Sequence, residues 1–176
     1  MLHEWLSPLG FNATQVQQIS AHLDSPSGRE YLSPTHSLVI DRETIVVERI
    51  QEPMKIPEQG SYRYSPSCVF RFDESDDICL SKSSSCATLD ASAIRFPLLI
   101  RPIQTGDRFT PFGMKGSRLV SDLLTDLKFT LHQKRRQLVI TDADDHILWL
   151  VGLRIDDHYR ITPQTRRMLI IQQENQ

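Results

Sequence analysis

The segment from residue 101 to residue 136 combines residue types that suit the binding of phosphate groups. It is punctuated by Gly106, Gly113 and Gly116, and glycine lets a backbone approach a ligand closely. It is also rich in Lys and Arg, whose side chains pair with phosphate oxygens. The pattern predicts a surface that follows a phosphate backbone through the side chains of Arg108, Lys115, Arg118, Lys128, Arg135 and Arg136.

A helix is expected directly after the third of these structural loop glycines. Ser117 can act as its N-cap, and apolar residues at helical spacing predict a helix over 118–128. Its buried face would be formed by Val120, Leu123, Leu124 and Leu127. A helix N-terminus beside Gly116 would favour an anion. Composition alone leaves open a plainer alternative, in which the basic residues form an ordinary solvated loop.

Other chemistries lack their motifs in this sequence. It contains no GxSxG elbow, P-loop, HExxH pair or GxGxxG fingerprint. The run Asp142–Asp145 faintly resembles a calcium loop, but His146 and Ile147 occupy positions that need an oxygen ligand and a glycine. We therefore interpret it as a hairpin turn. The histidines lie too far apart for a metal site, so no catalytic residue and no metal ligand is predicted.

Composition and charge set the class of protein. The 176 residues are 39% hydrophobic and 24% charged with a net charge of −2, which is typical of a globular chain. Residues 1–99 hold 8 Lys and Arg against 13 Asp and Glu, net −5, whereas residues 100–176 hold 12 against 9, net +3. A basic back half indicates an anionic partner, unless the asymmetry is chance.

The cellular location follows from cysteine usage and from the apolar runs. The three cysteines are an odd number without CxxC spacing, which favours reduced thiols and a cytoplasmic protein. Apolar runs are too short to cross a bilayer, and no signal peptide opens the chain. No membrane partner is therefore expected.

The front of the chain has the pattern of helices. Apolar residues at a period of 3.6 predict a short first helix with a face formed by Leu2, Trp5, Leu6 and Leu9. Asn12 and Gln15 have the spacing of a capping box for a second helix, flanked by Phe11 and Val16 at the staple positions. The run 24–28 predicts the turn that ends it.

Strands dominate the rest. A period of two predicts a hairpin of Leu38 and Ile40 against Ile45 and Val47 around a turn at 41–44, and further strands near 62–64, 68–72, 93–101, 138–141, 146–151 and 168–171. Residues 73–90 are acidic and serine-rich, and we expect a solvated loop there. The predicted fold is α+β: a short helical connector, a strand-rich middle, and a compact, mostly antiparallel C-terminal domain with one short helix. Trp149 is expected in its core.

The run Arg101–Gly116 resembles the opening of the C-terminal domain of bacterial tRNA(Ile)-lysidine synthases. The resemblance continues to about Ile171 through Ser121-Asp122, Asp126-x-Lys128, Trp149-x-x-Gly152-x-Arg154-Ile155 and Thr162-x-x-Thr165. Residues 1–99 look like the family's connecting, substrate-recognition region, which places a domain boundary near residue 100. Two departures stand out: Leu119 replaces a second basic residue after Gly116, and Phe129-Thr130 replaces an Ile-Pro pair.

The resemblance implies a function. Enzymes of this family use ATP to ligate lysine onto the wobble cytidine of tRNA(Ile), which switches decoding from Met to Ile codons. Their adenylating domain carries a Ser-Gly-Gly-x-Asp-Ser phosphate loop, which is absent here. We therefore expect a tRNA-binding C-terminal part that is inactive alone and holds no cofactor, with ATP and Mg²⁺ implied for the full-length enzyme.

The expected partner is tRNA(Ile), contacted on its acceptor-stem side, and a homodimer is left open. The alternative is a different class of function, a protein-interaction or dimerisation module that uses the same basic surface.

Overall fold

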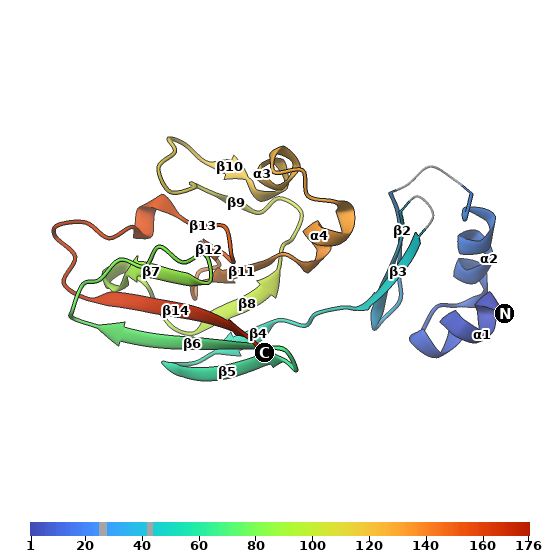
Figure 1. The fold of residues 1–176 in the computed structure, drawn as a ribbon, viewed down its shortest axis with the longest axis horizontal. Coiled ribbons are helices and arrows are strands. Elements are labelled where there is room, and N and C mark those ends of the chain that lie inside the picture. The colour runs from blue at the N-terminus through green and yellow to red at the C-terminus, as the bar shows by residue number, and fades with distance from the viewer. Residues whose placement is uncertain (25–27, 42–43) are drawn as a thin grey trace. The chain divides into compact units, whose positions relative to one another are not determined.

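The computed structural model describes residues 1–24, 28–41 and 44–176, which form two compact units (Figure 1). The front unit comprises Met1–Gln51 with Thr130–Gln133, and the main unit comprises Glu52–Phe129 with Lys134–Gln176. The turns expected at 24–28 and 41–44 lie partly outside the described residues, at 25–27 and 42–43. None of the described helices is long and apolar enough to cross a membrane.

The helical elements are α1 (Leu2–Leu6), η1 (Ser7–Leu9), α2 (Ala13–Ala21), η2 (Ala91–Ala93), α3 (Val120–Asp126), α4 (Leu131–Arg136) and η3 (Asp157–Tyr159). The strands are β1 (Arg29–Leu32), β2 (His36–Asp41), β3 (Thr44–Arg49), β4 (Met54–Ile56), β5 (Gly60–Ser65), β6 (Cys68–Ser75), β7 (Cys86–Asp90), β8 (Leu98–Pro102), β9 (Arg108–Phe109), β10 (Arg118–Leu119), β11 (Leu138–Thr141), β12 (Ile147–Leu150), β13 (Arg154–Ile155) and β14 (Met168–Asn175).

Two local predictions for the front unit are confirmed. The Asn12 side chain accepts from the backbone N–H of Gln15 at 2.9 Å, and the Gln15 side chain accepts from the backbone N–H of Asn12 at 3.0 Å. Phe11 and Val16 are buried in one core with apolar residues of β2. The predicted face of the first helix is wrong at Trp5, which is 72% exposed, whereas Leu6 beside it in α1 is fully buried.

An antiparallel sheet in the order β1-β2-β3 completes the front unit. The predicted hairpin is confirmed, with Leu38 opposite Val47 and Ile40 opposite Ile45. Since side chains alternate between the faces of a strand, this register places these four residues on one face, and they pack on the helices.

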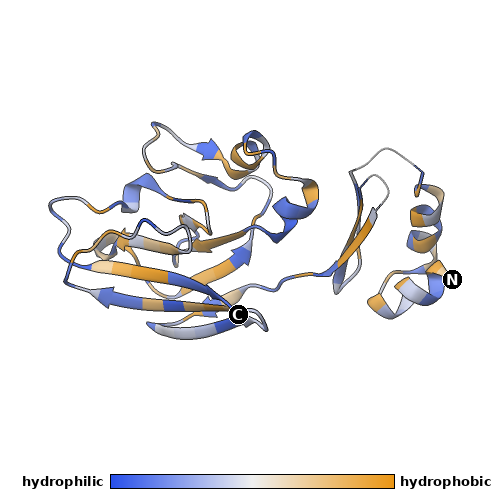
Figure 2. Cartoon of the chain, in the orientation of Figure 1, coloured by the Kyte–Doolittle hydropathy of each residue, from blue (hydrophilic) through white to orange (hydrophobic). Residues whose placement is uncertain are grey.

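The main unit is built from two antiparallel sheets that share a core. The large sheet has the order β13-β12-β11-β8-β4, and the small sheet has the order β5-β6-β14-β7. Phe70 and Phe72 of β6 are fully buried against Ile100 and Ile140 of the large sheet. Arg71 between them is exposed, Val69 and Asp73 on either side are less buried, and Figure 2 shows this alternation along the strand. Trp149 is buried in this core, as expected.

The opposite face of the large sheet is also buried. Val139 and Leu150 pack there with Leu124 of α3 and Phe109 of β9. Burial on both faces explains why β11 and β12 are buried at every position and almost entirely apolar, rather than alternating between apolar and polar residues. The β9–β10 ribbon and α3 therefore rest on a rigid base, and this base positions the segment singled out by its glycines and cations.

One sequence prediction differs from this architecture. The expected solvated loop over 73–90 is wrong at both ends, because β6 continues to Ser75 and β7 occupies Cys86–Asp90, where Ala87 and Leu89 are buried against β14. The compact units divide between Gln51 and Glu52, since β4 pairs with β8 and β14 pairs with both β6 and β7. The boundary expected near residue 100 concerns the regions of the resembling family and stays a prediction.

Asp90 ties the end of β7 to the turn that precedes β14. Its carboxylate accepts from the Thr165 hydroxyl at 2.6 Å and from the Ser92 backbone N–H at 2.9 Å. Burial alone would raise the pKa of Asp90, but these hydrogen bonds outweigh it and hold the pKa below its usual value. A lowered pKa stabilises the fold above the unfolded-state pKa, and this stability is lost as the pH falls through the folded-state pKa.

We expect Asp90→Asn to lower the free energy of unfolding at pH 7 by about 1–2 kcal/mol, since a charge-assisted hydrogen bond is weakened. The difference from the parent protein should shrink as the pH falls below about 4. Urea unfolding at several pH values measures it. A difference that stays constant down to pH 3 would contradict the electrostatic origin.

Candidate nucleic-acid interface

The base of the glycine-rich loop is held by a buried ion pair. The Arg101 guanidinium, on β8, donates to both carboxylate oxygens of Asp107 at 2.8 and 2.9 Å, and to Asp145 at 3.2 Å. Burial would lower the pKa of Arg101, but pairing with Asp107 and Asp145 raises it, so the guanidinium stays charged. Asp107 also accepts from the backbone N–H of Gln104 at 2.7 Å, which fixes the first turn of the loop.

Two carboxylates of the segment after β13 fix the middle of the loop. Asp156 is buried and accepts from the backbone N–H of Thr110 at 2.8 Å. Asp157 accepts from the backbone N–H of Gly113 at 3.2 Å. The loop is thereby held from two sides, so its tip is presented in a defined conformation.

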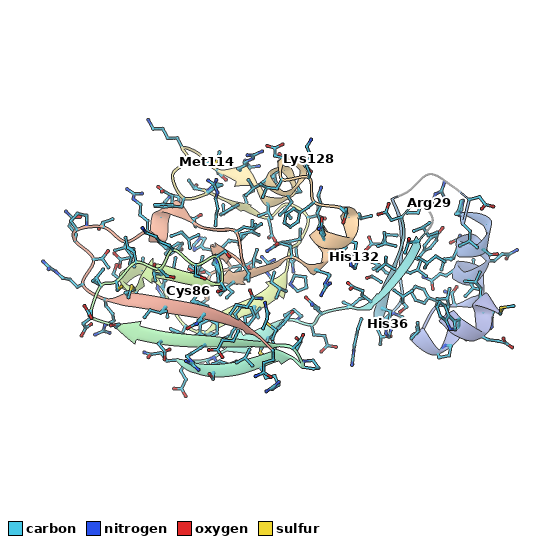
Figure 3. All side chains as sticks on the ribbon, in the orientation of Figure 1. Arg29, His36, Cys86, Met114, Lys128 and His132 are labelled. Atoms are coloured by element: carbon cyan, nitrogen blue, oxygen red, sulfur yellow. The ribbon has the colours of Figure 1, made fainter. Side chains whose placement is uncertain are left out.

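The tip of the loop exposes an aromatic, a thioether and an ammonium group. Phe112 is 51% exposed and Met114 is 38% exposed, and Lys115 is exposed beside them. Figure 3 shows Met114 on this tip and Lys128 after α3, both along the top of the view. Exposed aromatic rings next to cations suit RNA, because bases stack on the ring while the cations meet phosphates.

The predicted RNA-binding residues occupy different environments. Arg108, on β9, donates to the Ser117 hydroxyl and backbone oxygen, both at 3.2 Å. Arg118, on β10, forms an ion pair with Asp126 of α3. Lys115 and Lys128 are exposed, and neither forms an ion pair with a described residue. Arg135 and Arg136 are exposed in the last turn of α4.

The expected helix over 118–128 is shorter than predicted. Arg118 and Leu119 instead pair with β9 as β10, so α3 begins at Val120 and has no side-chain cap. Ser117 serves as an acceptor for Arg108 rather than as an N-cap. Val120, Leu123 and Leu124 are buried as predicted, but Leu127 is 47% exposed because the helix has already ended at Asp126. The predicted anion site at a helix N-terminus beside Gly116 is therefore wrong.

The basic run 134–136 lies in a helix, α4, that was not predicted. Thr130 and Gln133 form reciprocal side-chain-to-backbone hydrogen bonds of 3.2 and 2.9 Å at the start of α4. This is the spacing of a capping box, and it was the signal available in the sequence.

The three structural loop glycines all adopt left-handed backbone conformations, with φ of 90° at Gly106, 80° at Gly113 and 83° at Gly116. We expect Gly113→Val and Gly116→Val each to lower stability by about 1–3 kcal/mol, because a β-branched residue is strained at positive φ. No described atom lies within 4 Å of a Cβ built at either position, so the loss would come from the backbone and not from a clash. Unchanged melting temperatures in thermal scans would show that neither conformation matters.

Arginines outside the predicted set lie beside the loop tip. Arg154 of β13 donates to the backbone oxygen of Phe112 at 3.4 Å. Arg160 follows η3 and pairs with Asp157 at 2.5 Å. Both line a groove of about 580 Å³ together with Phe112 and Lys82. Arg154 stands in the Trp149-x-x-Gly152-x-Arg154 motif, which was the one sequence signal for it.

The acidic run after β11 forms a hairpin turn, as predicted. Asp142 is buried and accepts from the backbone N–H groups of Asp144 and His146, both at 2.9 Å. Ligand atoms of these three residues lie within 4.8 Å of one another. The hydrogen bonds of Asp142 close the turn between β11 and β12, so the arrangement is explained without an ion.

Comparison with known proteins gives matches at both ends of the chain. Residues 1–52 match the family profile described as "TilS substrate binding domain", and residues 98–171 match "TilS substrate C-terminal domain". The chain is 34% identical to the tRNA(Ile)-lysidine synthase of Bacteroides thetaiotaomicron over 96% of its length, which is 38% of that protein. It is 33% identical to that of Parabacteroides distasonis over 97% of its length and 40% of the relative.

A solved structure shares the fold. The crystal structure described as a TilS C-terminal domain superposes with a TM-score of 0.60 at 16% identity, covering 70% of this chain and 98% of the other. The chain thus spans about 40% of the length of the curated relatives it matches.

Proposed function

This chain belongs to the tRNA(Ile)-lysidine synthase family, and it matches the substrate-binding and C-terminal domains of that family; we therefore propose that it binds tRNA. The observation that carries the proposal is the loop tip, where Phe112 and Lys115 are exposed on a backbone fixed by three carboxylates. A preorganised loop loses little conformational freedom on binding, so cation–phosphate contacts contribute more of their energy to affinity.

The finer parts of the proposal follow the family. The tRNA is tRNA(Ile), held on its acceptor-stem side, in the cytoplasm, by a chain that can form a homodimer. The full-length enzyme ligates lysine to the wobble cytidine with ATP and Mg²⁺. The sequence contains no Ser-Gly-Gly-x-Asp-Ser phosphate loop, so no ligand of ATP or Mg²⁺ is assigned to this chain.

Binding of tRNA against an unrelated RNA duplex of equal length tests the proposal. We expect tighter binding to tRNA, with a logarithm of the binding constant that falls linearly with the logarithm of salt concentration, since each phosphate contact releases condensed counterions. Equal affinity for both RNAs would mean that the chain attracts RNA phosphates non-specifically and does not recognise tRNA. No binding to either would favour the protein-interaction interpretation of the basic surface.

A further inference from the structure

The groove beside the loop tip has an apolar wall and a cationic rim. Trp149 and Ile155 of the large sheet line it, and Trp149 is only 2% exposed, so the groove reaches down to the core. Phe112 stands at the groove and leaves half of its surface open to solvent. This combination places an exposed aromatic ring beside an apolar wall, which suits a planar ligand.

The charge of the groove has one sign. Among the described residues that line it, Lys82, Arg154 and Arg160 are cationic and none is acidic. The whole chain carries a net charge of −2, so this is not the average surface of the molecule. Lys82 and Arg154 form no ion pair with a described residue, and their charges are available to a ligand.

We propose that this groove binds an unpaired nucleotide of RNA, with the base against Phe112 and the apolar wall and the adjacent phosphates at Lys82 and Arg154. An apolar wall under a cationic rim complements a nucleotide, whose base is planar and apolar on its faces and whose phosphate is anionic. A paired base presents only its edges, so the groove selects single-stranded RNA over duplex. The inference rests on the proposed function, because it assigns a subsite to the same RNA-binding surface.

Arg160 has a supporting role at this rim. Its Nη1 atom pairs with Asp157, which itself holds the backbone of Gly113. A guanidinium carries five N–H donors, so this pairing leaves donors for a phosphate. The Arg160–Asp157 pair thereby links the groove to the loop that carries Phe112.

The test uses the full chain and a fluorescently labelled single-stranded RNA tetranucleotide, compared by anisotropy with the same sequence in a blunt duplex. We expect the single strand to bind at least several-fold more tightly. Phe112→Ala should weaken it by roughly 10-fold, as stacking is lost. Arg154→Gln should lower the salt slope by about 0.7. Phe112 and Arg154 are exposed, and melting temperatures will verify that both variants fold.

Two matched variants serve as controls. Trp5→Ala removes an exposed aromatic side chain, and Arg166→Gln removes an exposed charge, but neither residue lines the groove. Both should leave tetranucleotide binding unchanged. Equal losses from Phe112→Ala and Trp5→Ala, or equal binding of single strand and duplex, would overturn the inference. Tighter binding of a Glu-rich, leucine-containing peptide would also overturn it and assign the groove to a protein.

The inference and the proposed function can fail separately. If tRNA with and without its unpaired 3′ end binds equally and the tetranucleotide does not bind, the groove is not a nucleotide site, but tRNA binding stands. If the tetranucleotide binds as expected and tRNA binds no better than the unrelated duplex, the groove is supported and the proposed tRNA specificity is rejected.

Discussion

Replacement of Arg101 by methionine is expected to lower the free energy of unfolding of the main unit by about 3–5 kcal/mol, because it leaves a buried carboxylate without its counter-charge. The Arg101 side chain is 3% exposed and that of Asp107 is 11% exposed. Water therefore solvates Asp107 poorly when its partner is removed. The loss therefore reflects an uncompensated charge more than the net value of the ion pair.

Arg167 provides the control for this substitution. Its side chain is 61% exposed and pairs with Glu74 at 3.5 Å and with Asp76 at 3.4 Å. Surface ion pairs of this kind are worth about 0–1 kcal/mol, so Arg167→Met should have a small effect. Urea unfolding of both variants measures the contrast.

A double variant separates the charge from the shape. Arg101→Met with Asp107→Leu should recover part of the loss, since a buried ion pair can often be replaced by apolar side chains at little cost. Recovery should be incomplete, because the Gln104 backbone N–H loses its acceptor. If the two single losses simply add in the double variant, the pair is not the origin of the effect.

The elements predicted correctly from the sequence are those whose signals are local. The capping box joins Asn12 and Gln15, which are three positions apart, and the alternation along β6 is a property of that strand alone. In both cases the residues that determine the structure lie only a few positions apart in the sequence. The order of residues in the chain was therefore enough.

The elements that were missed depend on distant partners. Ala87 and Leu89 sit in a serine-rich and acidic stretch, and they form a strand because β14, some eighty residues later, pairs with them. Arg118 and Leu119 have helical spacing to the apolar residues of α3, but Phe109 and Arg108 draw them into a ribbon. In neither case does the local sequence contain a signal of the distant strand with which the residues pair.

The same distinction applies to the candidate site. The sequence indicated which segment is basic, but the availability of each charge depends on the fold. Arg118 meets Asp126 across α3, and Arg108 bridges to Ser117 across the ribbon. Arg154 was absent from the predicted set, because only the pairing of β12 with β13 brings it beside Phe112.

We expect replacement of Lys115, Lys128 and Arg154 together by glutamine to weaken tRNA binding by roughly 100-fold at 0.1 M salt, since each phosphate contact contributes about 0.7–0.9 to the salt slope. These cations are exposed and form no ion pair with a described residue. Neutralising Arg118 should have a smaller effect, because a phosphate must first compete with Asp126. Filter binding across several salt concentrations gives both the affinity and the slope.

A control of equal charge distinguishes contact from long-range attraction. Replacement of Arg49, Lys55 and Arg63 by glutamine also removes three positive charges, but from the acidic front half of the sequence. It should change the salt slope much less. Counterions are released only where a cation displaces them at a phosphate, so a lower slope reports contact, whereas net charge acts mainly on the encounter rate. Equal losses of slope from the two sets would mean that the loop tip is not the RNA-binding surface. The basic residues around α3 would then be better explained as a surface for an acidic protein.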